Sequence, residues 1–572
     1  MNATWIDLDP STKAAVHNAI ISKSSILTQQ GLSNCIWALQ AMGYSIYDES
    51  GIDVAAVGLR NSFSTAIVRL SPSITAQGVA TTLYSMGKMG CRFSTLPIQT
   101  RISLESVCVR ERSSMGAKEV SMALYGLAKM DTSLNIFSKN TQGHFISAVT
   151  KSCRSMDEQE LGNTVWALCR LGYGLKGESG RALFDAIVRK QEQLKRQSLL
   201  AIFQGLASQA SIAADNSFEY SDDFLPVPNR VAIWVDLPPT LKDALLTSLD
   251  RLLEVPAEET AADGTGGNSS ISISFDPQLA GTVLYQLGRL RAWHADLPDF
   301  ILSKLLSHMS APATDPMSQE AAVVLSNQTG ERTHGRGFRS PVVLGVNGIA
   351  SMGVKWDLMD PKDRDVLYST ILKTLNEHLQ ALSQMPTQGN EEGTGRPMSP
   401  AGISSFLWSL GRMGLKFKSL LPIASPILSE SELESESTDK EMAGNKMSAT
   451  VPVGATSYPE SSVMKRLESA LERDLLLAVE RVVPAMTPYE LAWSLWALAK
   501  TGVTFTDLIA SKRPLGMLLL LAVNRHISAM GERELGIVLW VSEVKSVSLL
   551  LIANLKLTST THVMSTEEIK SL

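Results

Sequence analysis

Apolar residues recur at helical spacing along most of this chain, and the clearest stretches share one phrase centred on tryptophan. The phrase reads CIWALQAMGY from Cys35, NTVWALCRLGY from Asn163, FLWSLGRMGL from Phe406 and SLWALAKTGV from Ser494. Apolar residues three or four positions apart define one face of a helix in each copy. A phrase that returns at a regular period predicts a solenoid of stacked repeats rather than a single globular core.

Weaker copies of the phrase extend the series to ten. The ten centres are Trp37, Tyr84, Tyr125, Trp166, Phe203, Tyr285, Asn347, Trp408, Trp496 and Trp540. The first five centres are 47, 41, 41 and 37 residues apart, which suits one two-helix unit per copy. Later intervals are 82, 62, 61, 88 and 44 residues, and the excess falls in tracts rich in polar residues, Gly and Pro. These tracts contain too few apolar residues to order themselves, so they predict disordered insertions at 210–236, 255–274, 310–339, 384–400 and 428–461.

The start and end signals of each copy predict a helical hairpin. In MTPYELAWSLWALAKTG, Thr487 is a good N-cap, Pro488 suits the first helical position, and Glu490 completes a capping box. Glycine six residues after the centre predicts a left-handed C-terminal residue and a first helix of about 14 residues. These glycines are Gly43, Gly90, Gly172, Gly353, Gly414 and Gly502.

A second helix is expected after each first helix. The candidate segments are Asp53 to Leu70, Ser179 to Leu194, Leu297 to His308, Lys362 to Leu382, Ser462 to Val483 and Leu515 to Met530. A similar segment, Pro10 to Leu27, lies before the earliest first helix in the chain, so we expect the chain to begin partway through a unit. The predicted fold is all-α, an αα-superhelix of about ten two-helix repeats, because no alternating strand pattern separates the helices. The predicted organisation is regular repeats over 1–209, a helix between polar insertions over 210–274, middle repeats over 275–383, a repeat between insertions over 384–461, C-terminal repeats over 462–556 and a tail over 557–572.

Composition adds three expectations. The five cysteines, at 35, 91, 108, 153 and 169, lack the close pairing of zinc or redox sites and are expected to be reduced core residues. The longest apolar stretch, Leu515 to Val523, is far shorter than the roughly 20 residues that span a bilayer. The start MNATWIDLDP resembles neither a signal peptide nor an Arg-rich transit peptide. We therefore predict no membrane association and find no visible import signal.

The net charge of −5 argues against a nucleic-acid partner, but the charge is unevenly distributed. Residues 51–200 contain 19 Lys and Arg against 11 Asp and Glu, a net charge of +8. Four residues after the centre, six copies carry a cation, and stacking would align these residues as a basic stripe that a phosphate backbone could follow. The basic stripe comprises Lys88, Lys129, Arg170, Arg289, Arg412 and Lys500. A cation in the last turn of a helix is equally explained by the helix macrodipole.

The aromatic centres have two interpretations. Single-strand binders stack bases on exposed aromatic rings. The centres lie among Leu, Val and Ala at helical spacing, which favours packing between repeats.

Three residues before the centre, the side chain is polar but varies between copies. The polar members are Asn34, Thr81, Asn163, Thr282 and Ser405, whereas Met122 and Trp493 break the series. A side chain that varies at one position of an otherwise constant repeat is typical of proteins that read one base per repeat. An unconstrained surface varies in the same way, so both interpretations remain open.

The chain shows no pattern that predicts catalysis, a metal site or a cofactor. The histidines, among them His144, His294, His334 and His378, are scattered and never form a metal-binding motif. The glycines at 264, 266 and 267 have neither a preceding strand nor a following GK[ST], so we expect a linker there. A run of Arg and Gly over 332–339 resembles the arginine-glycine segments of RNA-binding proteins and equally suits a surface loop.

The phrases ELGNTVWALCRLGY, ELAWSLWALAKTGV and ISSFLWSLGRMGL resemble the octotricopeptide repeats of algal organelle proteins. They are also similar to the leucine-rich helical region of FAST-kinase-like proteins and to the armadillo-like subunits of the RNA-editing substrate-binding complex. The resemblance spans most of the chain. It implies a non-enzymatic protein that binds single-stranded RNA, in the mitochondrion rather than the chloroplast, and acts in RNA processing, stability or translation.

The chain departs from these families in two respects. About thirty residues follow Trp540, too few for the small C-terminal domain to which nuclease activity is attributed in many relatives. The irregular intervals after Phe203 would interrupt a continuous one-base-per-repeat track. The alternatives are a protein-binding scaffold of armadillo or HEAT type and a structural subunit of a ribonucleoprotein complex. None of these readings involves a small-molecule substrate.

Overall fold

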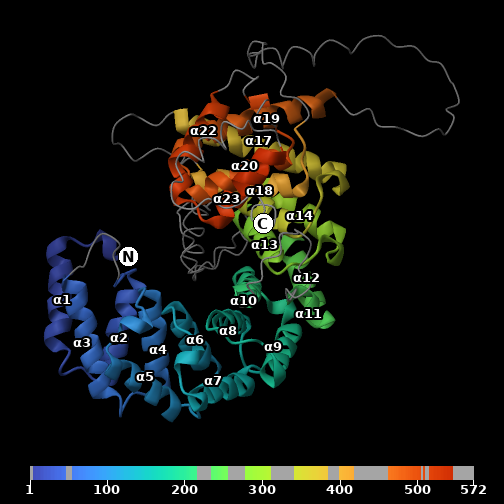
Figure 1. The fold of residues 1–572 in the computed structure, drawn as a ribbon. Helices are drawn as coiled ribbons and strands as arrows, with labels where there is room; N and C mark the ends of the chain where they lie inside the picture. Colours follow the sequence, from blue (N-terminus) through green and yellow to red (C-terminus); the bar gives the residue numbers. More distant parts are fainter. Residues whose placement is uncertain are drawn as a thin grey trace, which may run out of the picture. The chain divides into compact units, whose positions relative to one another are not determined.

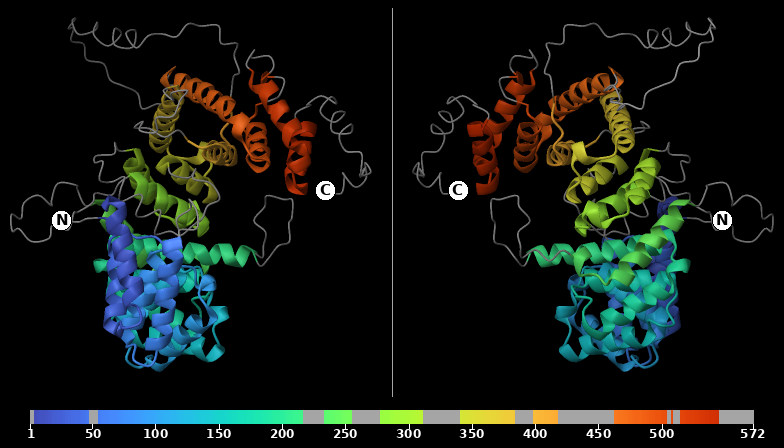
Figure 2. Two further views of the ribbon diagram at one scale, coloured as in Figure 1. Left: turned by 90° about the vertical axis from the view of Figure 1, so that its left-hand side faces the viewer. Right: turned by 90° about the vertical axis from the view of Figure 1, so that its right-hand side faces the viewer.

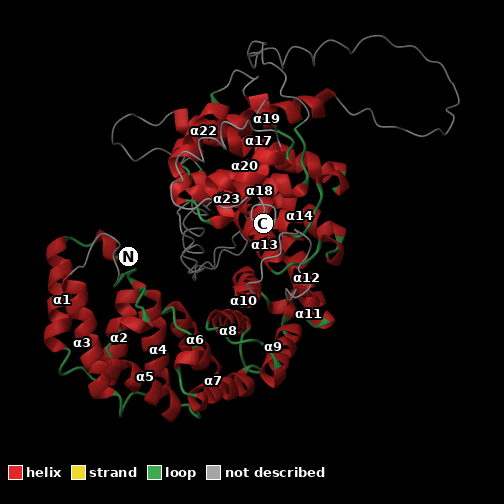
Figure 3. Ribbon diagram, viewed as in Figure 1, coloured by secondary structure: helices red, strands yellow, loops and turns green. Residues whose placement is uncertain are grey.

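The protein is an all-α helical-repeat solenoid, as the sequence predicts (Figure 3). The computed structural model describes residues 4–46, 54–215, 233–254, 277–310, 340–383, 398–417, 462–503, 507–508 and 514–544, and these residues contain helices and no strand. The predicted insertions at 255–274 and 428–461, and nearly all of those at 310–339 and 384–400, lie outside this description. The insertion predicted at 210–236 is partly wrong, because α10 continues to Asp215 and α11 spans Ile233–Asp236.

The chain divides into two compact units, Met1–Arg332 and Thr333–Leu572. In the N-terminal unit the first helices are α2 (Gln29–Ala41), α4 (Ala76–Lys88), α6 (Ala117–Lys129), α8 (Glu158–Arg170), α10 (Arg196–Asp215) and α13 (Pro277–Arg289). Its second helices are α1 (Pro10–Lys23), α3 (Val54–Leu70), α5 (Ile98–Arg110), α7 (Lys139–Ser152), α9 (Gly177–Arg189), α12 (Pro239–Glu254) and α14 (Asp299–Ser310).

The C-terminal unit repeats this arrangement. Its first helices are α16 (Pro341–Ser351), α18 (Pro400–Met413), α20 (Pro488–Lys500) and α23 (Glu532–Val544). Its second helices are α17 (Pro361–Ser383), α19 (Ser462–Val482) and α22 (Leu515–His526). All ten predicted centres therefore lie on first helices.

Each unit consists of two packed rows. First helices pack on first helices, from α2 to α13 and from α16 to α23, while second helices form the other row. In Figure 1 the N-terminal unit curves, with α2, α4, α6 and α8 on its inner side and α1, α3, α5 and α7 on its outer side. Figure 2 shows the helices of the blue N-terminal segment side by side from two further directions. The core lies between the two rows, where Leu83, Leu127 and Leu168 are almost completely buried.

The predicted helix ends are confirmed. The Thr487 side chain accepts from the Glu490 N–H, the Glu490 carboxylate accepts from the Thr487 N–H, and Pro488 opens α20. All six glycines that follow the centres have φ between 76° and 95°. Asp131 and Arg291 stand at the same position in the copies that lack glycine, and they also have positive φ, 53° and 54°. The repeat therefore imposes the left-handed conformation on whichever residue stands there.

Two recurring hydrogen bonds, one between backbones and one from a serine side chain, set the register between neighbouring copies. The N–H nine residues after one centre donates to the carbonyl five residues after the next: from Ile46 to Met89, from Phe93 to Met130, from Leu134 to Leu171 and from Phe417 to Thr501, each over 2.9 Å. In three copies the serine four residues before the centre donates to a carbonyl at the start of the next first helix: Ser33 to Gly78, Ser121 to Glu160 and Ser404 to Glu490. Small side chains are needed there because the helices lie close together.

The glycines of the first helices mark the closest approach of two backbones. A Cβ at Gly126 of α6 would lie 2.4 Å from the Leu83 carbonyl of α4 and 2.6 Å from the Tyr84 nitrogen. Gly205 of α10 faces Val165 and Trp166 of α8 in the same way. Since Gly126 follows its centre by one residue, the equivalent centre of α10 is Gln204. The predicted centre, Phe203, is thus one residue out of register and points into the core, where it is fully buried.

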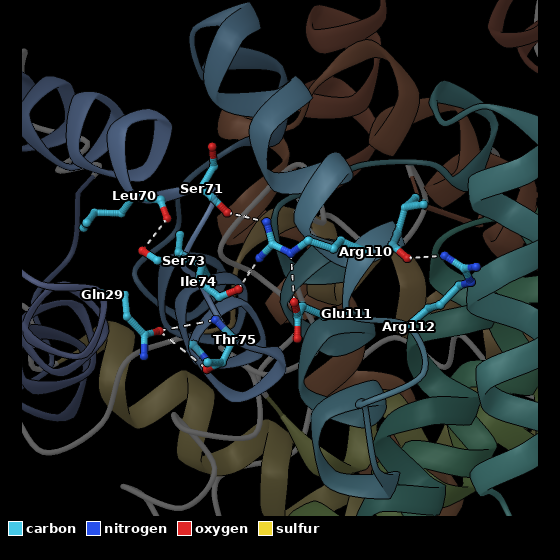
Figure 4. Close-up of polar contacts among 11 residues, drawn as sticks. Gln29, Leu70, Ser71, Ser73, Ile74, Thr75, Arg110, Glu111 and Arg112 are labelled. Carbon is cyan, nitrogen blue, oxygen red and sulfur yellow. Dashed lines mark hydrogen bonds and ion pairs between the residues drawn. The ribbon is translucent and has the colours of Figure 1, made fainter.

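Arginines near the ends of the second helices join that row together, a feature the sequence did not indicate. The Arg110 guanidinium of α5 donates to the carbonyls of Ser71, over 2.7 Å, and Ile74, at the end of α3 (Figure 4). Four other second helices repeat this contact: Arg69 donates to Ser24 and Leu27, Arg251 to Gln191 and Leu194, Arg481 to Leu379, and Arg525 to Pro484. Because a cation and a helix C-terminus attract one another, these arginines stabilise the stacking of repeats.

We expect Arg110→Met to destabilise the N-terminal unit by about 1–3 kcal/mol, because two charge-assisted hydrogen bonds to carbonyls are lost. Hydrogen exchange of the α3 and α5 amides should accelerate. The control is Arg112→Met, because exposed Arg112 donates to the Val109 carbonyl of its own turn. Equal exchange rates in the two variants would show that Arg110 does not join the helices.

The cysteines occupy the positions expected of reduced core residues. All five are free, and Cys91, Cys108, Cys153 and Cys169 are buried. Burial raises the pKa of Cys91 and Cys108 to about 12, so these thiols stay protonated and weakly reactive at neutral pH. Among the described residues, no helix is both long and apolar enough to cross a membrane.

Candidate nucleic-acid interface

The first helices reach solvent along one narrow line. On α8 every residue from Leu161 to Cys169 is buried except Asn163, and on α6 every residue from Val120 to Ala128 is buried except Met122. The solvent-facing line consists of the positions seven and three residues before the centre, the centre itself, whose side chain is buried on α6 and α8, and four residues after it. These positions share one helical face. Both sets of residues that the sequence singled out, the basic stripe and the varied polar residues, lie on this line.

In the N-terminal unit the solvent-facing line contains cations and amides but no carboxylate. With Gln204 as the centre of α10, the four positions on six helices hold five cations: Lys88, Lys118, Lys129, Arg170 and Arg289. The position seven residues before the centre is Gln30, Gln77, Lys118, Gln159, Gln197 and Gln278 in chain order. The macrodipole favours Asp and Glu in the first helical turn, and acids do stand at neighbouring positions there, Glu119 on α6 and Glu158 and Glu160 on α8, but none stands at this position. The recurring Gln was overlooked in the sequence although its fixed offset was visible there.

The basic stripe is continuous over three neighbouring helices. Lys88, Lys129 and Arg170 end α4, α6 and α8, which pack in that order. Burial lowers the pKa of Lys88. For Lys129, burial first and then the charges of Lys88 and Arg170 lower the pKa to about 7. These cations lie close enough on the stacked helices to repel one another. One carboxylate, Asp131, approaches Arg170 at 3.5 Å.

The other stripe residues form separate groups. On α10 the equivalent position is Ser208, so the stripe is interrupted between Arg170 and Arg289. In the C-terminal unit Arg412 and Lys500 lie on the adjacent helices α18 and α20. Lys88, Lys129 and Arg170 are thus adjacent in the N-terminal unit, where α10 separates them from Arg289, and Arg412 and Lys500 are adjacent in the C-terminal unit.

The side chains of four stripe residues turn back over aromatic centres. Lys129 Nζ lies 5.8 Å from the Tyr125 ring centroid and 5.2 Å from that of Trp166. Equivalent contacts join Arg289 to Tyr285 at 5.8 Å, Arg412 to Trp408 at 5.1 Å and Lys500 to Trp496 at 5.5 Å. Each cation stands in the last turn of its helix, as the macrodipole interpretation requires, but its side chain runs along the solvent-facing line.

The aromatic centres pack between repeats. Ring centroids are 5.5 Å apart for Tyr84 and Tyr125 and 5.0 Å apart for Tyr125 and Trp166. Tyr125, Trp166 and Trp496 are at least nine-tenths buried, so these rings cannot receive a base. Trp37 is the exception, with 53% of its surface exposed. The Trp540 side chain lies outside the described residues.

The polar residues three positions before the centre also lie on the line. Asn34 is exposed, whereas Thr81, Asn163, Thr282 and Ser405 are half-buried. Thr282 donates to the Gln278 carbonyl over 2.7 Å, and Ser405 receives the Asn347 amide over 3.0 Å. About ten ångströms of helix separate this position from the stripe, since seven residues each rise about 1.5 Å.

Two comparisons with known proteins give no relative for this chain: no family model matches it, and no curated protein matches it.

Proposed function

We propose that this protein binds single-stranded RNA along the solvent-facing line of its first helices. The observation that carries the proposal is the absence of carboxylates from this line, which holds five cations in the N-terminal unit of a chain whose net charge is −5. A polyanion is the ligand that such a charge distribution suits. The amides and hydroxyls beside the cations suit bases that are not already paired.

The biological setting follows from the resemblance of the repeats to octotricopeptide and FAST-kinase-like proteins. We propose a non-enzymatic role in organellar RNA processing, stability or translation, with the mitochondrion as the compartment. Other ribonucleoprotein subunits are the further partners that this role implies.

The direct test is equilibrium binding of the purified protein to a pool of single-stranded RNAs over a salt series, beside duplex RNA of the same length. We expect the logarithm of affinity to fall linearly with the logarithm of salt concentration, and single strands to bind more tightly. No binding at low salt would overturn the proposal and favour a protein-binding scaffold.

RNA affinity should depend on pH through Lys129. Because the pKa of Lys129 is about 7 in the free protein, the amine is largely neutral at pH 8. A phosphate nearby favours the charged form and raises this pKa, so binding takes up a proton and affinity falls as pH rises above 7. One coupled proton changes affinity by at most about tenfold per pH unit.

The control is Lys129→Arg, because a guanidinium stays charged throughout this range. We expect its affinity between pH 7 and 9 to be flatter than that of the wild-type protein. The contribution of Lys88, whose pKa is also lowered, is common to both proteins. Parallel pH profiles would show that Lys129 does not meet a phosphate.

A further inference from the structure

The solvent-facing line of α20 carries aromatic rings at both positions before its centre, where the other described first helices carry none. Tyr489, Trp493 and Trp496 occupy the position seven residues before the centre, the position three before it, and the centre itself. Adjacent rings meet edge to face, with centroids 6.1 Å apart for Tyr489 and Trp493 and 5.8 Å apart for Trp493 and Trp496. We call these three residues the aromatic column.

Only the first ring of the aromatic column, that of Tyr489, is exposed to solvent. Tyr489 is 55% exposed, whereas Trp493 and Trp496 are 8% and 6% exposed. The Trp493 indole N–H is buried and has no hydrogen-bond acceptor within the part of the chain that the structure describes. An unused buried donor is costly, and it suits an acceptor that a ligand brings.

Cations flank the aromatic column. The Arg533 guanidinium of α23 lies 4.9 Å from the Trp493 ring centroid, and Lys500 Nζ lies 5.5 Å from that of Trp496. Glu490, the neighbour of Tyr489 in the sequence, accepts the Thr487 N–H over 2.7 Å as part of the helix cap. The column therefore offers a flat ring, a hydrogen-bond donor and two positive charges.

These groups match the parts of a nucleotide. The face of a base stacks on an exposed ring, a base carbonyl accepts a hydrogen bond, and the phosphate pairs with Arg or Lys. An apolar peptide would make no use of the two positive charges, and an acidic peptide would make no use of the exposed ring.

We propose that the aromatic column is a stacking site for an unpaired base of the bound RNA, with Tyr489 as the platform. This inference rests on the proposed function and assigns to the C-terminal unit a contact with a base.

The test compares two single-stranded oligonucleotides of equal length and phosphate number, one with bases and one fully abasic. The wild-type protein should prefer the strand with bases. Tyr489→Gln introduces the residue that four of the N-terminal helices carry in exposed form at this position, so the start of α20 is preserved. We expect it to reduce the preference for bases by roughly tenfold and to leave the salt slope unchanged. Tyr489→Phe retains the ring and should retain the preference.

The outcomes separate the two proposals. Failure of the wild-type protein to bind either strand overturns the proposed function. Binding of both strands with equal affinity, or an unchanged preference in Tyr489→Gln, overturns the stacking site and leaves the phosphate contacts standing. Equal loss of affinity for both strands in Tyr489→Gln also contradicts stacking, because the abasic strand has no ring to lose.

Discussion

Gly126→Ala should destabilise the N-terminal unit by about 3 kcal/mol or more. The added Cβ would lie 2.4 Å from the Leu83 carbonyl, a distance that real Cβ atoms essentially never show. The obstacle is backbone, which cannot rotate away as a side chain can, so α4 and α6 must separate. Separation would also disturb the stacking of Tyr84 on Tyr125. The measurement is urea denaturation followed by circular dichroism at 222 nm, the usual wavelength for helix content.

The matched control is Gly143→Ala on α7. Gly143 is also in the interior of a helix, but it is exposed and nothing lies within 4 Å of a Cβ there. We expect this variant to be about 0.5–1 kcal/mol more stable, because alanine is the better helix former. If Gly126→Ala were equally stabilising, the close approach of the first helices would be refuted.

The triple variant Lys88→Gln, Lys129→Gln and Arg170→Gln should lose most of the salt dependence of RNA binding. Each phosphate contact contributes about 0.7 to the salt slope for a single strand, so three contacts contribute about 2. If the variant and the wild-type protein bind RNA equally at 1 M salt, a slope smaller by about 2 makes the variant's affinity about a hundredfold lower at 0.1 M salt. Stability should not fall, since burial opposes the charge of both lysines.

The control for this variant changes three exposed cations outside the solvent-facing line, Arg112, Lys151 and Arg154, to glutamine. At pH 6, where Lys129 is largely protonated, both variants lose three positive charges, so a general electrostatic effect would weaken both alike. An equal loss of slope would mean that RNA is attracted by overall charge and that the basic stripe has no special part.

Much of the candidate site was predictable because the repeat itself is encoded locally. Helix caps, the glycine at the end of each first helix and the offset of Lys88, Lys129 and Arg170 from their centres all depend on residues within one turn or two. The recurring Gln at positions such as Gln77 and Gln159 was present at a fixed offset as well.

The register of α10 could not be predicted in the same way. Phe203 looks like a centre because it is aromatic and lies 37 residues after Trp166. Only the approach of Gly205 to the α8 backbone shows that Gln204 occupies the equivalent place. The interruption of the basic stripe on α10 does not depend on this register, since residue 207 is Ala and residue 208 is Ser.

The sequence by itself therefore determined the class of fold, the ends of the helices and which residues share a face, since these depend on hydrogen bonds and side-chain spacing within one helix. Only the tertiary structure decided which faces meet solvent, how burial and the cations on α4 and α8 depress the pKa of Lys129, and which arginines join neighbouring second helices. It also decided that Tyr489 is exposed while the adjacent Trp493 is buried beneath Arg533. These properties depend on groups from different repeats, which lie dozens of residues apart in the sequence and become neighbours only when the helices stack.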